Sequence, residues 1–294
     1  MILDIETALI LARWVHFVST FGLFGAVAFE AYAGPAARGV APALRPWLIL
    51  GAASALASAV AWLLLEGASF ENAWSAALDP KIVSKVLIGI YFGHVWAVRL
   101  IIADLVLVFA AAPDGRIRNL ILGLLAASLA GSLGLTGHAA METGGLGLLH
   151  RVNHTVHLLA IGVWLGGLWP LALALRLDPS LAALAVRRFS DVGVGVVLLI
   201  LGSGCVNSWF LIGSWHGLWT SDYGHVLIIK VLLVVTMVGL AAVNRLVLLR
   251  RIAEPATLAR LGRHVLAEQL LGLAILAAAS LLGTLPPAGF GPSQ

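Results

Sequence analysis

Eight apolar stretches, each long enough to cross a lipid bilayer as a helix, limit what this chain can fold into. A helix needs about 20 residues to cross the hydrocarbon core, whereas the strands of a membrane barrel are about 10 residues long and alternate in polarity. Charged residues make up 11% of the chain, compared with about 25% in soluble domains. The stretches therefore predict an all-α, polytopic membrane protein with eight transmembrane helices, and they exclude a soluble fold. They cover residues 9–32, 46–66, 93–112, 117–137, 151–175, 189–212, 224–249 and 264–285.

The segments between these stretches are too short to form a separate catalytic domain. Any chemistry or transport is therefore expected inside the helical bundle or at its two ends. Asp4 and Glu6 precede the first stretch, where a signal peptide would carry basic residues, so we expect this stretch to remain as a membrane helix. The net charge of +4 is attributed to arginines in cytoplasmic loops rather than to nucleic-acid binding.

Arginine distribution predicts the orientation of the bundle. Arginines are concentrated in alternate connections, and by the positive-inside rule those connections face the cytoplasm. Both termini and the segments 67–92, 138–150 and 213–223 are then periplasmic. The first of these segments places apolar residues of 82–90 opposite Lys81 and Lys85, the pattern of a short interfacial helix. The arginines in the cytoplasmic connections are Arg38, Arg45, Arg116, Arg118, Arg176, Arg187, Arg188, Arg245, Arg250, Arg251, Arg260 and Arg263.

Two pairs of matching segments indicate an internal duplication. Residues 92–100 align without gaps on 223–231, keeping an aromatic residue, glycine, histidine, valine and a cation in register. Residues 15–17, around His16 near the start of the first span, resemble residues 156–158, around His157 near the start of the fifth. We therefore predict two parallel four-helix repeats, residues 1–137 and 151–294, joined by an outward loop at 138–150 and related by an axis along the membrane normal. The alternative is a chance similarity between apolar segments.

Eight of the nine histidines lie near the predicted outer face, and only His264 lies near the inner face. Imidazole is a good ligand for copper, zinc, iron and nickel. His150, His154 and His157 are spaced i, i+4 and i+7, which places them on one face of a helix. His16 lies at a similar depth in the first span, so the sequence predicts a shared metal site below the outer surface. The alternative is that interfacial histidines serve only as polar anchors.

The loop at 138–150 adds softer ligands to this prediction. His138, Met141 and Glu142 occur there close together on a glycine-rich segment. A thioether beside imidazoles favours copper over magnesium or calcium. The predicted metal ligands are His16, His138, Met141, His150, His154 and His157.

A second set of polar or soft side chains lies inside the predicted spans, where such groups are costly and often functional. Arg99 and Lys230 are near enough to a helix end to extend toward the headgroups. Asp104 follows Arg99 at a spacing that is poor for an intrahelical pair, so we expect its partner on another helix. Cys205 and Met237 are either soft ligands on a transport path or part of the core. These residues are predicted to line a transport path or to be structural polar groups. The full set is Glu30, Arg99, Asp104, Cys205, Asn207, Lys230, Met237, Asn244 and Glu268.

Residues 135–139, 156–168 and 223–230, together with Asn244 and Arg245, resemble the copper resistance protein CopD family. This resemblance implies an eight-span bacterial inner-membrane protein that passes copper from periplasm to cytoplasm beside a soluble periplasmic carrier of the CopC type. Members of the family tend to carry histidine and methionine near the periplasmic face. Here Met141 is the only outward methionine, which favours an imidazole site that accepts Cu(II).

The sequence bears on two other functions besides copper binding and transport. Two histidines at matched depth on facing helices are also typical of a haem-binding membrane electron carrier. Such a haem would be non-covalent, because the chain contains no Cys-x-x-Cys-His motif. An enzyme is not expected, since neither a zinc-protease His-Glu-x-x-His motif nor a nucleophile elbow occurs.

Overall fold

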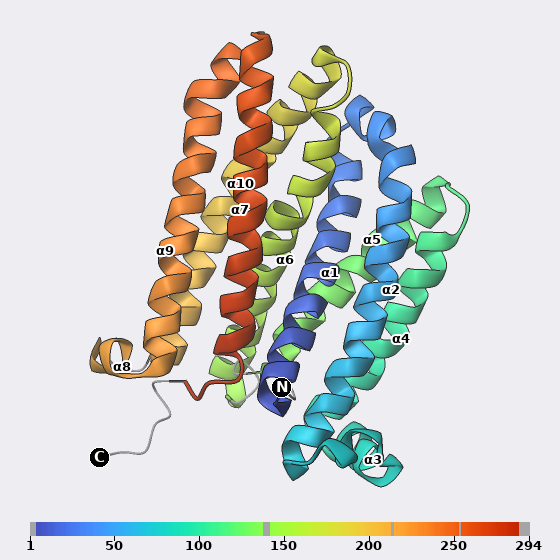
Figure 1. Cartoon of the computed structure of the whole chain (residues 1–294), viewed down its shortest axis with the longest axis vertical. Helices are drawn as coiled ribbons and strands as arrows, with labels where there is room; N and C mark the ends of the chain where they lie inside the picture. Colours follow the sequence, from blue (N-terminus) through green and yellow to red (C-terminus); the bar gives the residue numbers. More distant parts are fainter. Residues whose placement is uncertain (1–3, 138–141, 213–214, 253, 288–294) are drawn as a thin grey trace.

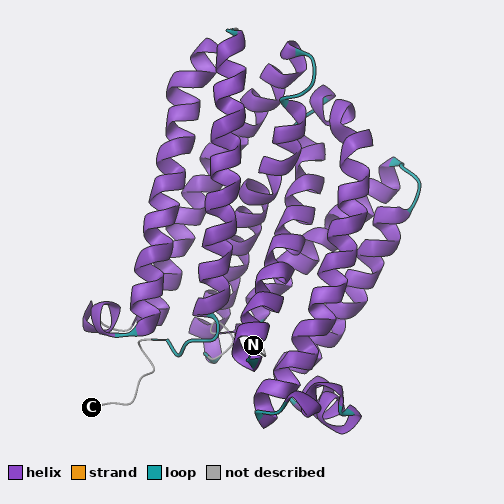
Figure 2. Ribbon diagram, in the orientation of Figure 1, coloured by secondary structure: helices purple, strands orange, loops and turns teal. Residues whose placement is uncertain are grey.

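The computed structural model describes residues 4–137, 142–212, 215–252 and 254–287. Those residues form helices joined by short loops, with no strand among them (Figure 2). Eight of the helices are long and apolar enough to cross a membrane. The predicted all-α membrane fold is therefore confirmed.

Four long helices come from each half of the chain (Figure 1). The first four are α1 (Ile5–Tyr32), α2 (Pro35–Glu71), α4 (Tyr91–Ala111) and α5 (Arg116–Gly131). The second four are α6 (Gly144–Ala174), α7 (Pro179–Ile212), α9 (Asp222–Val243) and α10 (Pro255–Leu282). The short elements are α3 (Pro80–Gly89), α8 (Trp215–Thr220), 3-10 turns at Trp74–Leu78, Ser132–Leu135 and Leu249–Arg251, and a π-helical turn at Asn244–Leu248.

Several helices start earlier than the apolar stretches that predicted them. Proline at the first position of α2 and α10 is favourable, because its missing N–H is not needed there and its φ suits a helix. Helix α6 begins at Gly144, so His150 lies within this helix and not in an outward loop that extends to residue 150. Hydropathy detects only the part of a helix inside the hydrocarbon core, which explains the shorter predicted limits.

Helices α1 and α6 cross closely at the centre of the bundle and join its two halves. At Gly25 and Gly166 an added Cβ would overlap the backbone of the opposite helix. Small residues of this kind let membrane helices approach closely enough for extensive van der Waals contact. Helix α1 also packs on α2, α5 and α10, and α6 packs on α7 and α10.

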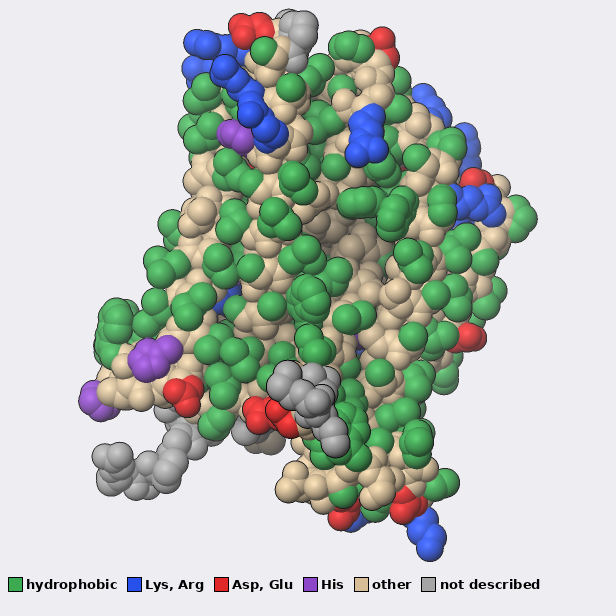
Figure 3. All heavy atoms as spheres, in the orientation of Figure 1, with side chains coloured by type: hydrophobic (Ala, Val, Ile, Leu, Met, Phe, Trp, Pro, Cys, Tyr) green, Lys and Arg blue, Asp and Glu red, His purple; other side chains and the backbone are tan. Residues whose placement is uncertain are grey.

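The two ends of the bundle differ in character. The start of α1, the end of α10, α3 and α8 lie at one end, which we call the terminus end (Figure 1). Lysine and arginine side chains gather mainly at the opposite, arginine-rich end, while apolar side chains cover much of the surface between them (Figure 3). Helix α3 corresponds to the predicted interfacial helix.

A candidate metal-binding cavity in the second half

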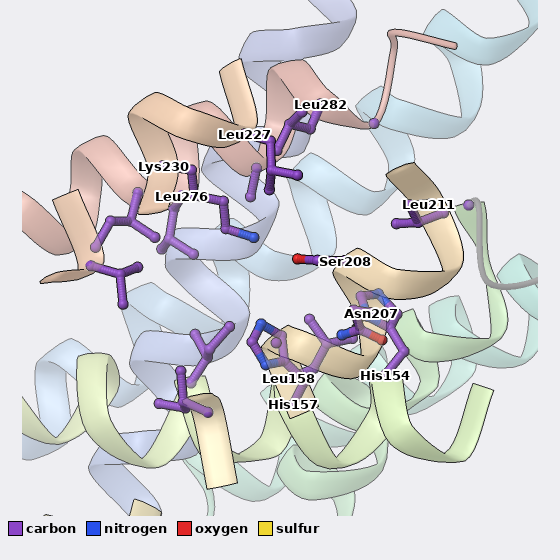
Figure 4. Close-up of a pocket in the computed structure, with 18 of the residues that line it drawn as sticks. His154, His157, Leu158, Asn207, Ser208, Leu211, Leu227, Lys230, Leu276 and Leu282 are labelled. Atoms are coloured by element: carbon purple, nitrogen blue, oxygen red, sulfur yellow. Dashed lines mark hydrogen bonds between the residues drawn. The ribbon is translucent and has the colours of Figure 1, made fainter. Parts of the chain in front are cut away.

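A cavity of about 1300 Å³ lies among α1, α6, α7, α9 and α10, toward the terminus end. Helix α9 makes its main contacts with α10 and α8, and so leaves space between itself and α6 and α7. Most of the lining is aromatic or aliphatic. Lys230 and Ser208 direct their polar ends toward the space that His157 and Asn207 also face (Figure 4). The polar groups of the lining include His150, His154, His157, Asn207, Ser208 and Lys230.

Three histidines follow one another along the cavity wall formed by α6. The ring centroids of His150 and His154 are 6.5 Å apart, and those of His154 and His157 are 6.4 Å apart. The ring of His150 stacks on Phe210 at 4.4 Å, and its Nδ1 lies 3.6 Å from the Glu142 carboxylate. The imidazoles thus form a row that leads from the terminus end into the cavity.

The hydrogen bonds of His157 define which ring nitrogen carries the lone pair. The hydroxyl of Ser203 donates to the carbonyl of Leu199, so its oxygen can accept from His157 Nδ1 at 2.9 Å. The imidazole proton is therefore on Nδ1, and Nε2 carries the lone pair. Nε2 has no hydrogen-bond partner within the described parts of the chain. His157 thus offers an unprotonated Nε2 as a single donor, and no three His, Cys, Asp or Glu side chains of the described residues are grouped so that they could hold a metal ion.

A second hydrogen-bonded chain orients His154. The amide of Asn153 donates to the Ser203 carbonyl and to Asn207 Oδ1, both at 2.9 Å. Asn207 Nδ2 then donates to Nδ1 of His154 at 3.2 Å, which places the His154 proton on Nε2. Ser203 consequently connects the two histidines, through its hydroxyl to His157 and through its carbonyl to Asn153. Metal binding at His154 Nδ1 requires the Asn207 amide to move aside.

The structure does not bring His16 together with these histidines. His16 is fully buried, is not among the described residues that line the cavity, and contacts α2 and α4. Its Nδ1 lies 3.1 Å from both the Ala55 carbonyl and the Ser58 hydroxyl, and Arg99 donates to its Nε2 at 2.7 Å. Both ring nitrogens are therefore occupied. The prediction that His16 shares a site with the α6 histidines is therefore wrong. It relied on equal depth along two helices, and depth does not determine which neighbour a side chain faces.

The contacts around His16 and His157 are alike in kind. In each case Nδ1 of the imidazole contacts the hydroxyl of a serine on the next long helix, and that hydroxyl donates to the backbone carbonyl four residues earlier in the same helix. Each histidine also has a cation from the predicted equivalent helix nearby, Arg99 for His16 and Lys230 for His157. Only Arg99 reaches the imidazole, whereas the Lys230 amine forms no hydrogen bond within the described residues. The two histidines therefore have similar surroundings, but only His157 faces the cavity. The internal duplication stays a prediction.

The remaining predicted residues are spread over the bundle. Asp104 is exposed on α4, and no ion pair between it and another described residue is present. Glu30 is partly buried near the arginine-rich end of α1. Cys205 and Met237 both line the cavity. His138 and Met141 lie outside the described residues.

Sequence reasoning missed the serine and asparagine residues that orient the imidazoles. Ser58, Ser203 and Asn153 carry no metal-ligand signature, and serine is common at helix–helix contacts in membranes. A usable signal was present nonetheless. Ser58 and Ser203 lie in the second helix of each predicted repeat, so aligning the repeats would have paired them as it paired His16 with His157.

Comparison with known proteins identifies the family of this chain. Residues 2–148 match the family model of the copper resistance protein D-like N-terminal domain, and residues 183–282 match that of copper resistance protein D. The chain belongs to the copper resistance protein D family. Its N-terminal family match covers α1 to α5, and its second match covers most of α7 to α10.

Three curated relatives of this family are similar over much of the chain. Inner membrane protein YebZ of Escherichia coli (strain K12) is 30% identical over 94% of this chain and 97% of its own length. Copper resistance protein D of Pseudomonas syringae pv. tomato is 30% identical over 95% of this chain and 96% of its own. Copper transport protein CutJ of Bacillus subtilis (strain 168) is 29% identical over 72% of this chain and 40% of its own. The comparison with solved structures gave no match.

Proposed function

We propose that this protein binds copper at the histidines of α6 and moves it across the bacterial inner membrane through the second half of the bundle. The observation that carries the proposal is the preset His157, whose Nε2 lone pair has no hydrogen-bond partner among the described residues. His154 and His150 lead to it at steps of about 6.5 Å, the centroid spacing along α6. Binding and transport, rather than catalysis, are the roles that these groups support.

Copper is the metal that the ligands and the family support best. Imidazole binds copper, zinc, iron and nickel, so the nitrogen ligands alone do not select among them. Relatives of this chain are named copper resistance and copper transport proteins, which favours copper. A row of imidazoles with Met237 at greater depth suits an ion that first meets nitrogen ligands and later a thioether.

The haem alternative depended on a pair formed by His16 and His157. Arg99 donates to Nε2 of His16, and Nδ1 of His16 is within hydrogen-bond distance of the Ser58 hydroxyl and the Ala55 carbonyl. Axial ligation by His16 would require breaking the contact with a buried arginine, which costs more than losing a neutral hydrogen bond. We therefore retain copper as the proposed cargo and use the absorption spectrum of the purified protein to test for haem.

We further propose that the terminus end faces the periplasm. The arginine-rich end then faces the cytoplasm, as the positive-inside rule requires. In this orientation the row of histidines opens toward the compartment from which a CopC-type carrier would deliver copper. Copper would move from periplasm to cytoplasm.

Replacing His157 tests the proposed site. We expect His157→Ala to lose copper that the purified wild-type protein binds, because it removes the preset lone pair. His225→Ala is a matched control, since His225 is an exposed histidine at the same end whose Nε2 contacts the Trp219 carbonyl. The measurements are copper per protein by elemental analysis and the visible absorption spectrum. Equal copper content in the two variants, or a Soret band without copper, would contradict the proposal.

A further inference from the structure

One carboxylate oxygen inside the second half of the bundle accepts no hydrogen bond of normal geometry from the described residues. Glu268 on α10 is 2% exposed, and its Oε2 accepts no hydrogen bond from any described residue. Burying an unpaired carboxylate oxygen is costly. Ionisable residues inside membrane spans usually face the bundle interior and are often associated with the path of an ion or proton. Glu268 therefore requires a functional explanation.

The other oxygen of Glu268 is held firmly in place. Asn244 Nδ2 donates to Glu268 Oε1 at 2.6 Å, and the Asn244 Oδ1 lies 2.6 Å from Nδ1 of His264. Because Nδ2 is the donor, Oδ1 must accept, and the His264 proton is on Nδ1. Support of this kind orients a ligand and is typical of the groups behind a metal-binding side chain. Asn244 thus fixes one oxygen, while the other has the Trp164 side chain nearby but no hydrogen bond of normal geometry with a described residue.

Glu268 lies next along the bundle beyond the cavity. Trp164, which lines the cavity, faces the Glu268 carboxylate with its side chain. On the other wall, Lys230 and Met237 are seven residues apart, so they lie on one face of α9 about 10.5 Å apart, and Asn244 begins the π-helical turn that follows α9. The first two line the cavity and the third contacts Glu268. Polar or soft groups thus continue from the cavity to Glu268, in the direction of the arginine-rich end.

We propose that Glu268 is a second cation-binding position, which receives copper through Oε2 after the ion leaves the histidine row. This inference rests on the proposed copper transport and extends it to the inner half of the bundle. Glu268 forms no ion pair with an arginine or lysine in the described structure, so no described cationic side chain occupies the place of a passing cation. Asn244 and His264 act as positioning residues.

The test separates copper binding from copper movement. Full-length protein is reconstituted into lipid vesicles that contain a copper-quenched dye, and copper sulfate is added outside with and without ascorbate. We expect Glu268→Gln to slow copper entry by at least the roughly tenfold that loss of an outer-shell partner costs a metal site. Copper bound at the histidine row should stay at the wild-type stoichiometry. Glutamine keeps the shape and the contact with Asn244, so the variant is expected to fold.

Two further variants complete the experiment. Glu30→Gln is the matched control, because Glu30 is a partly buried carboxylate near the same end of the first half, and we expect wild-type copper entry. Glu268→Asp keeps the charge on a shorter side chain and should give an intermediate rate.

The outcomes distinguish this inference from the proposed function. Wild-type copper entry in Glu268→Gln, or equal slowing in Glu30→Gln, overturns the role of Glu268 and leaves the histidine site intact. A wild-type protein that binds copper but admits none also overturns it. A wild-type protein that binds no copper overturns the proposed function itself.

Discussion

Removing the Ser203 hydroxyl is expected to weaken copper binding without touching a metal ligand. In the structure this hydroxyl accepts from His157 Nδ1 at 2.9 Å and donates its own proton to Leu199. In Ser203→Ala the imidazole loses the partner that holds its proton on Nδ1 and its lone pair on Nε2. Loss of such a partner typically weakens metal binding 10- to 100-fold, which corresponds to about 1.4 to 2.7 kcal/mol.

The first half provides a control with the same geometry. Ser58 contacts Nδ1 of His16 at 3.1 Å and donates to its own i−4 carbonyl at 2.6 Å. Ser58→Ala and Ser203→Ala each remove two hydrogen bonds of a buried hydroxyl, so both should lower the free energy of unfolding by about 2 kcal/mol. Only Ser203→Ala should lower copper affinity, because His16 remains held by Arg99 and the Ala55 carbonyl.

Competition with a chelator of known copper affinity measures the effect. The dissociation constant is compared for wild type and the two serine variants in the same detergent, with melting temperature as the measure of stability. The reasoning is refuted if Ser203→Ala binds copper as tightly as wild type, or if Ser58→Ala weakens binding to the same extent.

Two other predictions concern folding. Gly166→Ala places a Cβ against the backbone of α1, and because a backbone cannot rotate away as a side chain can, we expect the free energy of unfolding to fall by about 3 kcal/mol or more. Gly193→Ala is the control, because a Cβ there meets no atom within 4 Å. A similar melting temperature for both variants would contradict this prediction. Hydrogen bonds from Thr7 lower the pKa of Asp4 below its ordinary 3.8, so its stabilisation of α1 is present above that pH and is lost as the pH falls through the lowered value. Asp4→Ala should therefore speed amide exchange in the first turn of α1 near pH 7 but not at about pH 2, and equal acceleration at both would show that the carboxylate charge has no role.

The eight membrane helices and the family could be predicted from the sequence alone. A helix must satisfy its backbone hydrogen bonds internally in lipid, so a long apolar stretch has essentially one available structure. The family motifs are local segments and are read directly, as in residues 156–168 around His157. The row from His150 to His157 follows from helical spacing, which is also a local property.

Tertiary structure decided which of the candidate ligands can act together. His16 and His157 have similar sequence contexts and similar depth, yet Arg99 reaches the first and Lys230 forms no hydrogen bond with the second. That difference depends on how α4 and α9 pack against their neighbours. No spacing within one helix contains this information.

The same reason explains the residues that sequence reasoning passed over. Ser203 gains its role only because α7 places it against His157. Glu268 is a candidate from the sequence, but only the packing of the neighbouring segment shows that Asn244 contacts one of its two oxygens. Helix formation depends on residues a few positions apart, and the sequence determines it almost entirely. A binding position depends on side chains from separate helices, and only their packing determines whether a polar atom is already paired or remains open to a ligand.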